Sequence, residues 1–310
     1  VADGHAATVE FRNYIFQHLR RLRRAGDIPE EASVIAALAA AELGATSCAI
    51  DEIFDCVDGV VIATPTSTHA GLLVRAAEAG VPAFCEKPVA LDIATTREVL
   101  AAVEASGTPV QIGFQRRFDA GYAAARAAVQ AGELGQVRRA HMLTCDPTPP
   151  PEQFVPSSGG IFKDCGIHDV DALRWVTGAE VVEVFAYGVP RGEDYFATHG
   201  DSSEATAVLK LDDGTLATLH LSRYNGQGYD VRMEVAGTAG TIAVGLDDHS
   251  ALRSVEPGVA FPAGESFSWF YPRFQDSYSA ELAAFVEVAR RAVPPPATVA
   301  DALEALYVCE

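Results

Sequence analysis

The sequence contains no uninterrupted apolar run of the roughly 18 residues that a membrane-spanning helix requires, so we expect no membrane association. Its first residues also lack the basic segment, apolar segment and small-residue cleavage site of a secretory signal. Basic residues are few, with 23 Lys and Arg against 42 Asp and Glu, which gives a net charge of −19. Such a charge repels phosphate, so we expect no nucleic acid partner.

Cysteine is also scarce, and no two of the six cysteines form a C-x-x-C pair. This spacing is neither that of a zinc site nor that of a disulfide framework. We therefore expect reduced thiols, no bound metal and a cytoplasmic protein. The cysteines are Cys48, Cys56, Cys85, Cys145, Cys165 and Cys309.

The sequence does contain a substantial core, because 49% of its 310 residues are hydrophobic, which is enough for two domains of ordinary size. From Ser33 to about Gly113, short apolar runs alternate with helical periodicity. The expected elements are strands at 57–64, 82–85 and 110–113, and helices at 70–79 and 94–105 that end at Gly80 and Gly107. This alternation predicts an α/β fold with a doubly wound parallel sheet.

Polar residues follow three of the expected strands. They are Thr64-Pro65-Thr66, Glu86-Lys87-Pro88 and Gln115-Arg116-Arg117. In doubly wound sheets, ligands bind beyond the carboxyl ends of the strands. Three polar strand ends on one rim therefore predict a binding site.

After Arg117 the pattern changes to strand-like runs joined by short turns. The expected elements are helices at 120–131, 162–175 and after Pro294-Pro295-Pro296, and strands at 137–144, 180–187, 204–211, 215–223, 229–236 and 240–244. Serial hairpins predict an α+β domain with a largely antiparallel open sheet. We therefore divide the chain into domains 1–117 and 118–310. The Pro-rich segment 146–156 is either a lid over the site or a plain surface loop.

The segment from Gly159 to His168 carries a candidate proton-transfer pair. Asp164 and His168 are four residues apart, so they share a face on a helix. A histidine beside a carboxylate and an ammonium, here that of Lys87, can transfer protons near neutral pH. Two other interpretations stay open: His168 as an ordinary hydrogen-bonded helix residue, and Asp164, His168 and Asp171 as metal ligands.

Four stretches, taken in order, resemble the glucose–fructose oxidoreductase / inositol dehydrogenase family of nicotinamide-dependent sugar and polyol oxidoreductases. They are Val60 to His69, Phe84 to Pro88, Gly113 to Asp119, and Gly159 to Asp171. The resemblance covers the chain from about Ser33 to Glu310. It implies a Rossmann-like first domain that binds NAD or NADP, and a second domain for substrate binding and oligomerisation.

The resemblance implies roles for the polar residues. Lys87 lies beside the substrate hydroxyl and the nicotinamide, and His168, oriented by Asp164, is the acid/base on the carbinol oxygen. Arg116 reaches the substrate. Hydride leaves carbon as a proton leaves oxygen, so a base must lie within hydrogen-bond reach of that oxygen. A lysine cation nearby stabilises the developing alkoxide.

The resemblance also implies a cofactor-binding set. Glu86 and Pro88 shape the nicotinamide ribose site, and Gln115 borders the nicotinamide. The residues that line the cofactor cleft are Thr64, Pro65, Thr66 and His69, together with Lys87. By the same analogy, the free face of the second-domain sheet pairs subunits into a homodimer or homotetramer.

One family feature is absent. Family members begin with a strand and a G-x-G-x-x-G turn that approaches the pyrophosphate, but residues 1–32 contain only Gly4 and Gly26. An alternative alignment makes Thr8–Phe11 the first strand, Tyr14–Arg24 the first helix and Ser33–Leu38 the second strand. The three glycine positions then fall near Glu10, Arg12 and Ile15. A decayed cofactor site, an unusual loop that still binds, and a first segment that is not the natural one all stay open.

The usual acidic residue at the end of the second strand is absent as well, since the first carboxylate after it is Glu42. Nothing therefore selects NAD over NADP. The sequence favours an oxidoreductase that transfers a hydride between the nicotinamide and a secondary alcohol or ketone of a sugar or cyclitol. The alternative is a catalytically silent sugar-binding or scaffold protein of the same fold that has lost dinucleotide binding. The segment Thr8–Ile15 discriminates between these two functions, because only the enzyme needs this segment to lie against a pyrophosphate.

Overall fold

The computed structural model of the chain describes residues 34–37, 54 and 57–310, and for 34–37 the backbone alone. Several predicted features lie outside these residues. They are the first strand Thr8–Phe11, the first helix Tyr14–Arg24, the glycine positions near Glu10, Arg12 and Ile15, the carboxylate Glu42, and the thiols Cys48 and Cys56. The chain forms two compact units.

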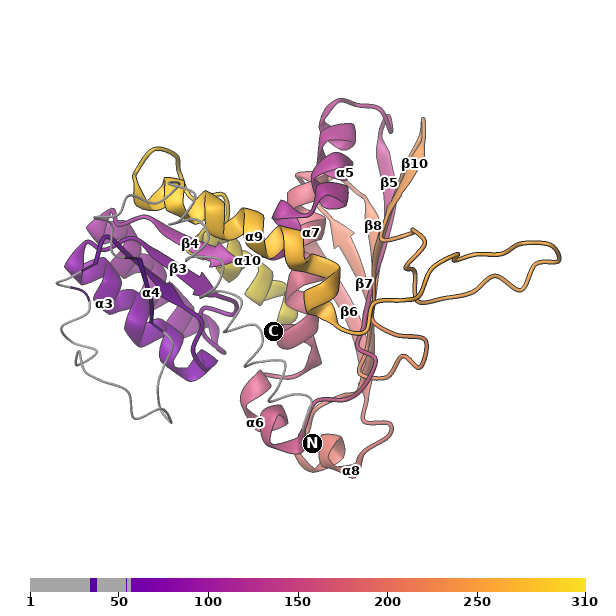
Figure 1. Cartoon of the computed structure of the whole chain (residues 1–310), viewed down its shortest axis with the longest axis horizontal. Coiled ribbons are helices and arrows are strands. Elements are labelled where there is room, and N and C mark those ends of the chain that lie inside the picture. The colour runs from indigo at the N-terminus through magenta and orange to yellow at the C-terminus, as the bar shows by residue number, and fades with distance from the viewer. Residues whose placement is uncertain (1–33, 38–53, 55–56) are drawn as a thin grey trace. The chain divides into compact units, whose positions relative to one another are not determined.

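A four-stranded parallel sheet forms the centre of the first unit (Figure 1). Its strands are β1 (Val34–Ala37), β2 (Gly59–Ile62), β3 (Ala83–Glu86) and β4 (Val110–Gly113), in the order β1-β2-β3-β4. Both β2 and β4 are buried along their whole length, as expected for strands covered on both faces. The Rossmann-like parallel sheet is thus confirmed, and β1 lies inside the predicted second strand.

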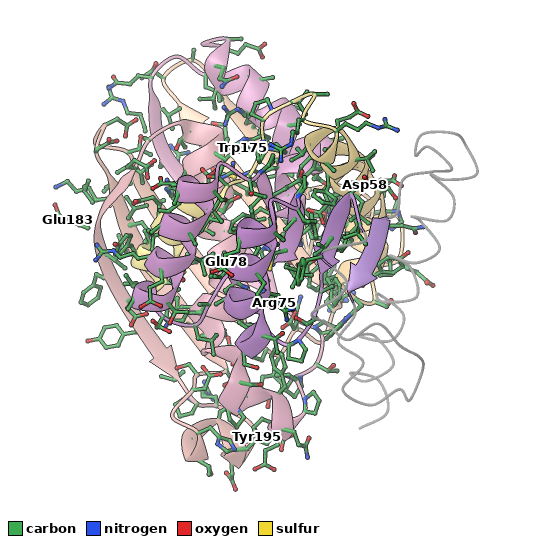
Figure 2. All side chains as sticks on the ribbon, turned by 90° about the vertical axis from the view of Figure 1, so that its left-hand side faces the viewer. Asp58, Arg75, Glu78, Trp175, Glu183 and Tyr195 are labelled. Carbon is green, nitrogen blue, oxygen red and sulfur yellow. The ribbon has the colours of Figure 1, made fainter. Side chains whose placement is uncertain are left out.

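Two helices connect these strands and end as the sequence predicts. Helix α3 (His69–Ala79) stops at Gly80, whose φ of 68° is left-handed. Helix α4 (Ile93–Ser106) begins at Asp92, which accepts a hydrogen bond from the amide of Thr95, and stops at Gly107. Arg75 and Glu78 both belong to α3, where Glu78 is exposed (Figure 2).

The first unit is not contiguous in sequence. It runs up to Phe114 and takes in Tyr278–Tyr307, whereas the second unit comprises Gln115–Ser277 and Val308–Glu310. The predicted division into 1–117 and 118–310 therefore differs from these units at 115–117, which belong to the second unit, and in one longer segment, Tyr278–Tyr307. That segment holds most of the helices α9 (Phe270–Ala289) and α10 (Val299–Cys309).

Helix α9 was not predicted. It covers the parallel sheet through Phe285, whose ring centroid lies 6.0 Å from that of Phe84 in β3. Its backbone is non-helical at Phe274, where two helices meet at a kink. Pro272 lies near the start of α9. The part of the helix that covers the sheet therefore follows both a proline and the kink.

A six-stranded sheet forms the second unit, in the order β10-β9-β5-β8-β7-β6. Its strands are β5 (Val137–Cys145), β6 (Val181–Val189), β7 (Glu204–Leu211), β8 (Leu216–Ser222), β9 (Asp230–Gly237) and β10 (Thr241–Val244). All neighbouring pairs are antiparallel except β5 and β8, which are parallel. The predicted largely antiparallel sheet is confirmed, and the parallel pair shows that the sheet is mixed.

Helices α5 (Ala120–Gln130) and α7 (Ile167–Thr177) pack on each other in this unit, and both contact its sheet. In β7, side chains alternate between buried and exposed, so this sheet has one covered face and one open face. A π-helical turn, Phe162–Gly166, leads into α7, so the predicted helix from 162 is confirmed with a wider first turn. Within the described ranges, no helix combines the length and the apolar character needed to span a bilayer.

Candidate active site

The turn after β2 carries the first predicted cofactor residues. Thr64 is half-buried and Pro65 is exposed. The hydroxyls of Thr64 and Thr68 lie 2.5 Å apart, and the Thr68 hydroxyl donates to the carbonyl of Pro65 at 2.8 Å. These bonds hold a short 3₁₀ turn at Thr66–Thr68, so the polar turn has a fixed shape at the carboxyl edge of the sheet.

His69 links this turn to the end of β3. It is 1% exposed, with Nδ1 at 2.8 Å from the carbonyl of Pro88 and Nε2 at 2.8 Å from the carbonyl of Thr64. Burial lowers the pKa of His69, and the two carbonyls oppose that effect. The structure therefore gives His69 the role of fastening two loops together, where the resemblance implied that it lines the cofactor cleft.

Glu86 and Lys87 follow directly at the edge of the sheet, and both are half-buried. The Lys87–Pro88 peptide bond is cis. Oε1 of Glu86 is inaccessible and has no hydrogen-bond partner among the described residues. Burial raises the pKa of Glu86 to about 7, although the ammonium of Lys87 opposes the rise.

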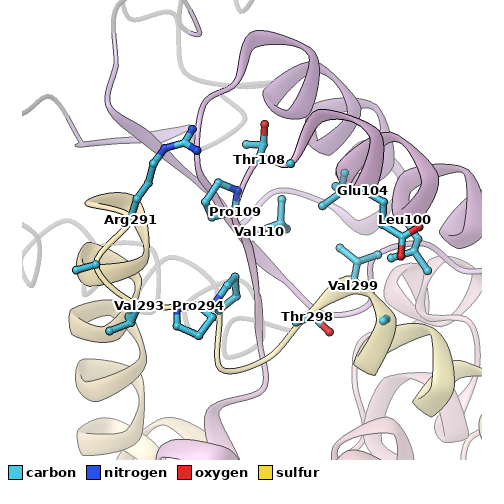
Figure 3. A pocket seen from close by; sticks show the side chains of 15 residues that line it. Leu100, Glu104, Thr108, Pro109, Val110, Arg291, Val293, Pro294, Thr298 and Val299 are labelled. Atoms are coloured by element: carbon cyan, nitrogen blue, oxygen red, sulfur yellow. The ribbon is translucent and has the colours of Figure 1, made fainter.

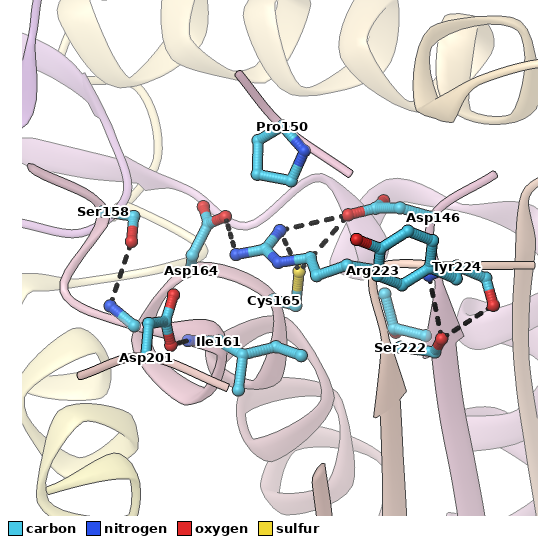
Figure 4. Close-up of polar contacts among 12 residues, drawn as sticks. Asp146, Pro150, Ser158, Ile161, Asp164, Cys165, Asp201, Ser222, Arg223 and Tyr224 are labelled. Atoms are coloured by element: carbon cyan, nitrogen blue, oxygen red, sulfur yellow. Dashed lines mark hydrogen bonds and ion pairs between the residues drawn. The ribbon is translucent and has the colours of Figure 1, made fainter. Parts of the chain in front are cut away.

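In the second unit, Asp164 belongs to an ion-pair cluster centred on Arg223 (Figure 4). The guanidinium of Arg223 is 3% exposed and donates to Asp164 at 2.7 Å and to Asp146 at 3.1 Å. It also donates to Sγ of Cys165 at 3.0 Å. Burial alone would lower the pKa of Arg223, but the surrounding anionic groups raise it well above its usual range, so Arg223 stays charged.

The same neighbourhood explains the two glycines that precede Asp164. Gly159 and Gly160 have φ angles of 80° and 90°, which favour glycine. A Cβ on Gly160 would lie 3.1 Å from Oδ1 of Asp201, which accepts a hydrogen bond from the amide of Ile161 at 3.0 Å. The glycine pair thus lets the chain turn tightly into the π-helical turn that carries Asp164.

His168 is half-buried and lies in the first turn of α7, two residues after the end of the π-helical turn. Single π turns inserted in α-helices are frequent at functional sites. Asp171, which a metal site would need as third ligand, instead accepts two hydrogen bonds from Arg117, at 2.9 and 2.5 Å. Asp171 is therefore engaged by Arg117, and the proposed metal site keeps only two of its three ligands.

Gln115 and Arg116 belong to the 3₁₀ turn Gln115–Phe118 and are buried, with exposed fractions of 4% and 1%. Arg116 donates to Asp169 at 2.6 Å and to the hydroxyl of Thr144 at 2.8 Å. Burial alone would lower the pKa of Arg116, and Asp169 raises it. The guanidinium is thus held by the interior of the second unit, which differs from the predicted contact with substrate.

The Pro-rich segment 146–156 is fastened to a short helix, α8 (Asp194–Thr198). The hydroxyl of Tyr195 donates to the carbonyl of Pro150 at 2.7 Å, and His199 lies 3.5 Å from Glu152. Pro150 lies near the Arg223 cluster in Figure 4. Whether the segment is a lid or a surface loop stays a prediction.

A groove of about 600 Å³ lies elsewhere in the first unit (Figure 3). It is lined by Thr108, Pro109 and Val110 on one side and by residues from Arg291 to Ala300 on the other. Val110 is the first residue of β4, so the groove is at the amino ends of the strands. Dinucleotides bind at the opposite, carboxyl edge, so this groove is not the cofactor site.

The carboxyl edge itself suits the nicotinamide half of a dinucleotide. It presents two hydroxyls, from Thr64 and Thr66, and the ammonium of Lys87, and these three residues are half-buried. Ribose hydroxyls pair with such donors and acceptors. These residues therefore fit the nicotinamide ribose of a dinucleotide. The segment expected at the pyrophosphate lies outside the described residues.

Arg223 is the site residue that the sequence analysis missed. It lies directly after β8, 59 residues from Asp164, and no local motif marks it. The only available signal was an arginine at the end of an otherwise uncharged strand.

Two family models match the sequence. Residues 15–114 match the model described as "Oxidoreductase family, NAD-binding Rossmann fold", and residues 122–243 match the "GFO/IDH/MocA C-terminal domain". The first match begins earlier than the resemblance from Ser33, so similarity extends into the segment expected to carry the first helix.

Relatives with established names cover most of the chain. The scyllo-inositol 2-dehydrogenase (NAD(+)) of Bacillus subtilis is 36% identical over 249 residues, which is 79% of this chain and 71% of that protein. The solved myo-inositol dehydrogenase of Corynebacterium glutamicum is 34% identical with a TM-score of 0.76, covering 85% of this chain and 79% of its own. The scyllo-inositol dehydrogenase of Lactobacillus casei, solved with NAD(H) and scyllo-inositol, is 27% identical with a TM-score of 0.75, covering 84% and 79%.

Proposed function

Since this chain belongs to the GFO/IDH/MocA family of oxidoreductases with an NAD-binding Rossmann fold, we propose that it oxidises a secondary hydroxyl of a cyclitol, with an inositol as the substrate. The observation that carries the proposal is the Arg223 cluster, which fixes the carboxylate of Asp164 one helical turn before His168. Inositol dehydrogenases among the relatives support the substrate class.

Lys87 and His168 divide the acid–base work in this proposal. His168 takes the proton from the hydroxyl, and Asp164 orients the imidazole and stabilises its charged form. The ammonium of Lys87 stabilises the alkoxide that develops as the C–H bond breaks. Both side chains are half-buried, so they are reachable by a small polar ligand.

The carboxyl edge of the parallel sheet holds the cofactor in this proposal. When bound, NAD supplies the carbon that accepts the hydride. The hydroxyls of Thr64 and Thr66 bind the ribose, while Glu86, Pro65 and Pro88 shape the cleft and Gln115 borders the nicotinamide. His69 acts on the cofactor indirectly, by fastening the loops of Thr64 and Pro88. Arg116 supports the second unit from within and is not part of the proposed substrate site.

Titration with NADH and then NADPH, followed by a screen of inositols and sugars, tests this function. We expect micromolar binding of NADH and reduction of NAD with at least one inositol. Millimolar or absent binding of both dinucleotides would contradict the proposal. It would favour the catalytically silent sugar-binding protein, which a calorimetric titration with inositols alone then detects.

We further propose that the open face of the mixed sheet pairs subunits into a homodimer or homotetramer. Phe185 and Tyr187 in β6 are 64% and 71% exposed, and their rings form an edge-to-face pair 5.3 Å apart. Val208 in β7 stands opposite Phe185 and is 46% exposed. A contiguous apolar patch of this kind is typical of an interaction surface. The side chain of Glu183 at the start of the same strand projects outward in Figure 2.

Phe185→Glu should therefore convert the oligomer to a monomer that still folds, because the side chain is exposed in the single chain. Light scattering coupled to size exclusion measures the mass. Val255→Glu, at a residue that is 84% exposed, is the matched control and should keep the oligomer. A monomeric wild-type protein, or an unchanged mass in the Phe185 variant, would rule out this interface.

A further inference from the structure

Helix α9 brings a buried carboxyl to the parallel sheet of the first unit. Glu281 is 1% exposed, and its backbone carbonyl accepts a hydrogen bond from Nε2 of Gln111 in β4 at 2.9 Å. Phe285, one turn further along, packs on Phe84 in β3. Residues four apart share a helix face, so Glu281 and Phe285 lie on the face of α9 that covers the sheet.

The strand beneath supplies a second carboxyl on that side. Phe84 and Glu86 are two residues apart in β3, so their side chains point to one face, the face that Phe285 covers. Gly113 pairs with Glu86 in the neighbouring strand, and a Cβ there would lie 3.0 Å from Oε2 of Glu86. The absent side chain of Gly113 thus leaves the space that the Glu86 carboxyl occupies.

This cluster has more acceptors than donors. Oε1 of Glu86, Oε1 of Gln111 and Oε2 of Glu281 are all buried and have no hydrogen-bond partner among the described residues. A buried acceptor without a hydrogen bond is unfavourable, and two negative charges in one apolar site repel each other. A proton on one carboxyl removes a charge and supplies a donor.

The electrostatics agree with the geometry. Burial raises the pKa of Glu86 to about 7. Burial, and then the charge of Glu86, raise the pKa of Glu281 well above its usual range. The charge of Glu86 therefore favours the protonated form of Glu281.

We propose that Glu86 and Glu281 share one proton at neutral pH and that this carboxyl pair positions Lys87. The proposal rests on the proposed function, in which Lys87 stabilises the alkoxide. A pair with one proton carries a single negative charge, which the adjacent ammonium balances. Loss of the proton leaves two negative charges beside Lys87, which draw its ammonium toward the sheet.

Among the described residues, few other titratable groups act on the pair. On β3, Cys85 precedes Glu86 and Lys87 follows it, and the charge of Lys87 acts on the Glu86 carboxyl against the effect of burial. The charge of Glu86 in turn raises the pKa of Cys85, after the larger effect of burial. From α3, His69 interacts with Lys87 and hydrogen-bonds to backbone carbonyls on both sides. Strand β4 contributes no charged side chain.

Glu281→Gln tests the shared proton without cofactor or substrate. Infrared difference spectra of the wild-type protein between about pH 5 and about pH 9, on either side of a pKa of about 7, should show the carbonyl band of a protonated carboxylic acid. The variant should keep only the part of the band that comes from Glu86, which stays buried, so the amplitude of the band should fall. Glu287→Gln is the matched control, because Glu287 lies on the same helix in an exposed pair with Arg290 and should leave the band unchanged.

The same variant changes stability with pH in a direction that follows from linkage. A carboxyl whose folded pKa is raised stabilises the fold below its unfolded pKa, and that contribution is lost as pH rises through the folded pKa. Wild-type Tm should therefore fall from about pH 5 to about pH 8 more steeply than that of the Glu281 variant, by roughly 2 °C or more. Glu86→Gln should have the same effect, and it replaces Glu281→Gln if that variant does not fold.

A carboxylic-acid band of unchanged amplitude in both the Glu281 and the Glu86 variant, or parallel Tm profiles, would overturn the proposal. These measurements are independent of catalysis. If NADH does not bind but the band and the Tm profiles behave as expected, the proton pair stands and the proposed function fails. If NADH binds and an inositol is oxidised while the band is unaffected, the function stands and the pair fails.

Discussion

Replacing Lys87 by methionine is expected to lower kcat for inositol oxidation by about 100-fold to 1,000-fold, the cost of removing one charged group from a developing oxyanion. Methionine keeps the length of the side chain but not the ammonium. Since Lys87 is half-buried at a strand edge, we expect only a small change in Tm. Steady-state kinetics with saturating NAD and the best inositol from the screen measure the effect.

The control for Lys87 is the exposed lysine of the open sheet face. Lys210→Met removes an ammonium that pairs with Glu183, so it changes charge equally and should leave kcat within about twofold. Near-normal turnover in the Lys87 variant would remove this lysine from the mechanism. The oxyanion would then be stabilised by a group that the present proposal does not name.

Replacing His168 by alanine is expected to lower kcat by about 100-fold to 10,000-fold, the usual contribution of a general base. A histidine base acts only when neutral, so the wild-type rate should rise with pH as the histidine loses its proton. In the variant this acidic limb should be flat, because the titrating base is gone. A pH–rate profile of kcat/KM measures both effects.

His220 offers the matched histidine control. It is 50% exposed on the outer sheet face, where it contacts Thr206 and Glu204, and His220→Ala should leave the profile unchanged. An acidic limb that survives in the His168 variant would assign that limb to another group. Asp164, which forms an ion pair with Arg223, would be the first group to replace by asparagine.

Local signals predicted the elements that local chemistry determines. Gly80 and Gly107 end their helices in left-handed conformations, as their places after apolar periodic segments indicated. The strand Val110–Gly113 matches its prediction residue for residue. Asp164 and His168 could be paired from their spacing because both lie in one segment.

Features that depend on distant partners could not be predicted in the same way. The family resemblance implied that Arg116 reaches the substrate, yet its carboxylate partner, Asp169, is 53 residues away and buried with it. Glu281 meets the sheet through a bond to Gln111 that spans 170 residues. A single sequence shows that such residues are charged or polar, but the fold decides which of them face one another.

The return of Tyr278–Tyr307 to the first unit has a consequence for how the protein is made. A ribosome adds roughly 5–20 residues each second, so on the order of 10 to 40 s separate the synthesis of Phe114 from that of Tyr307. The second unit needs only three residues after Tyr307. It can therefore fold while the first unit still lacks Tyr278–Tyr307. Through this interval the side of the β3–β4 sheet that carries Phe84 lacks its helical cover. The nucleotide-binding half of this chain, although it is translated first, is expected to be the last to finish folding and the longer client of chaperones on the nascent chain.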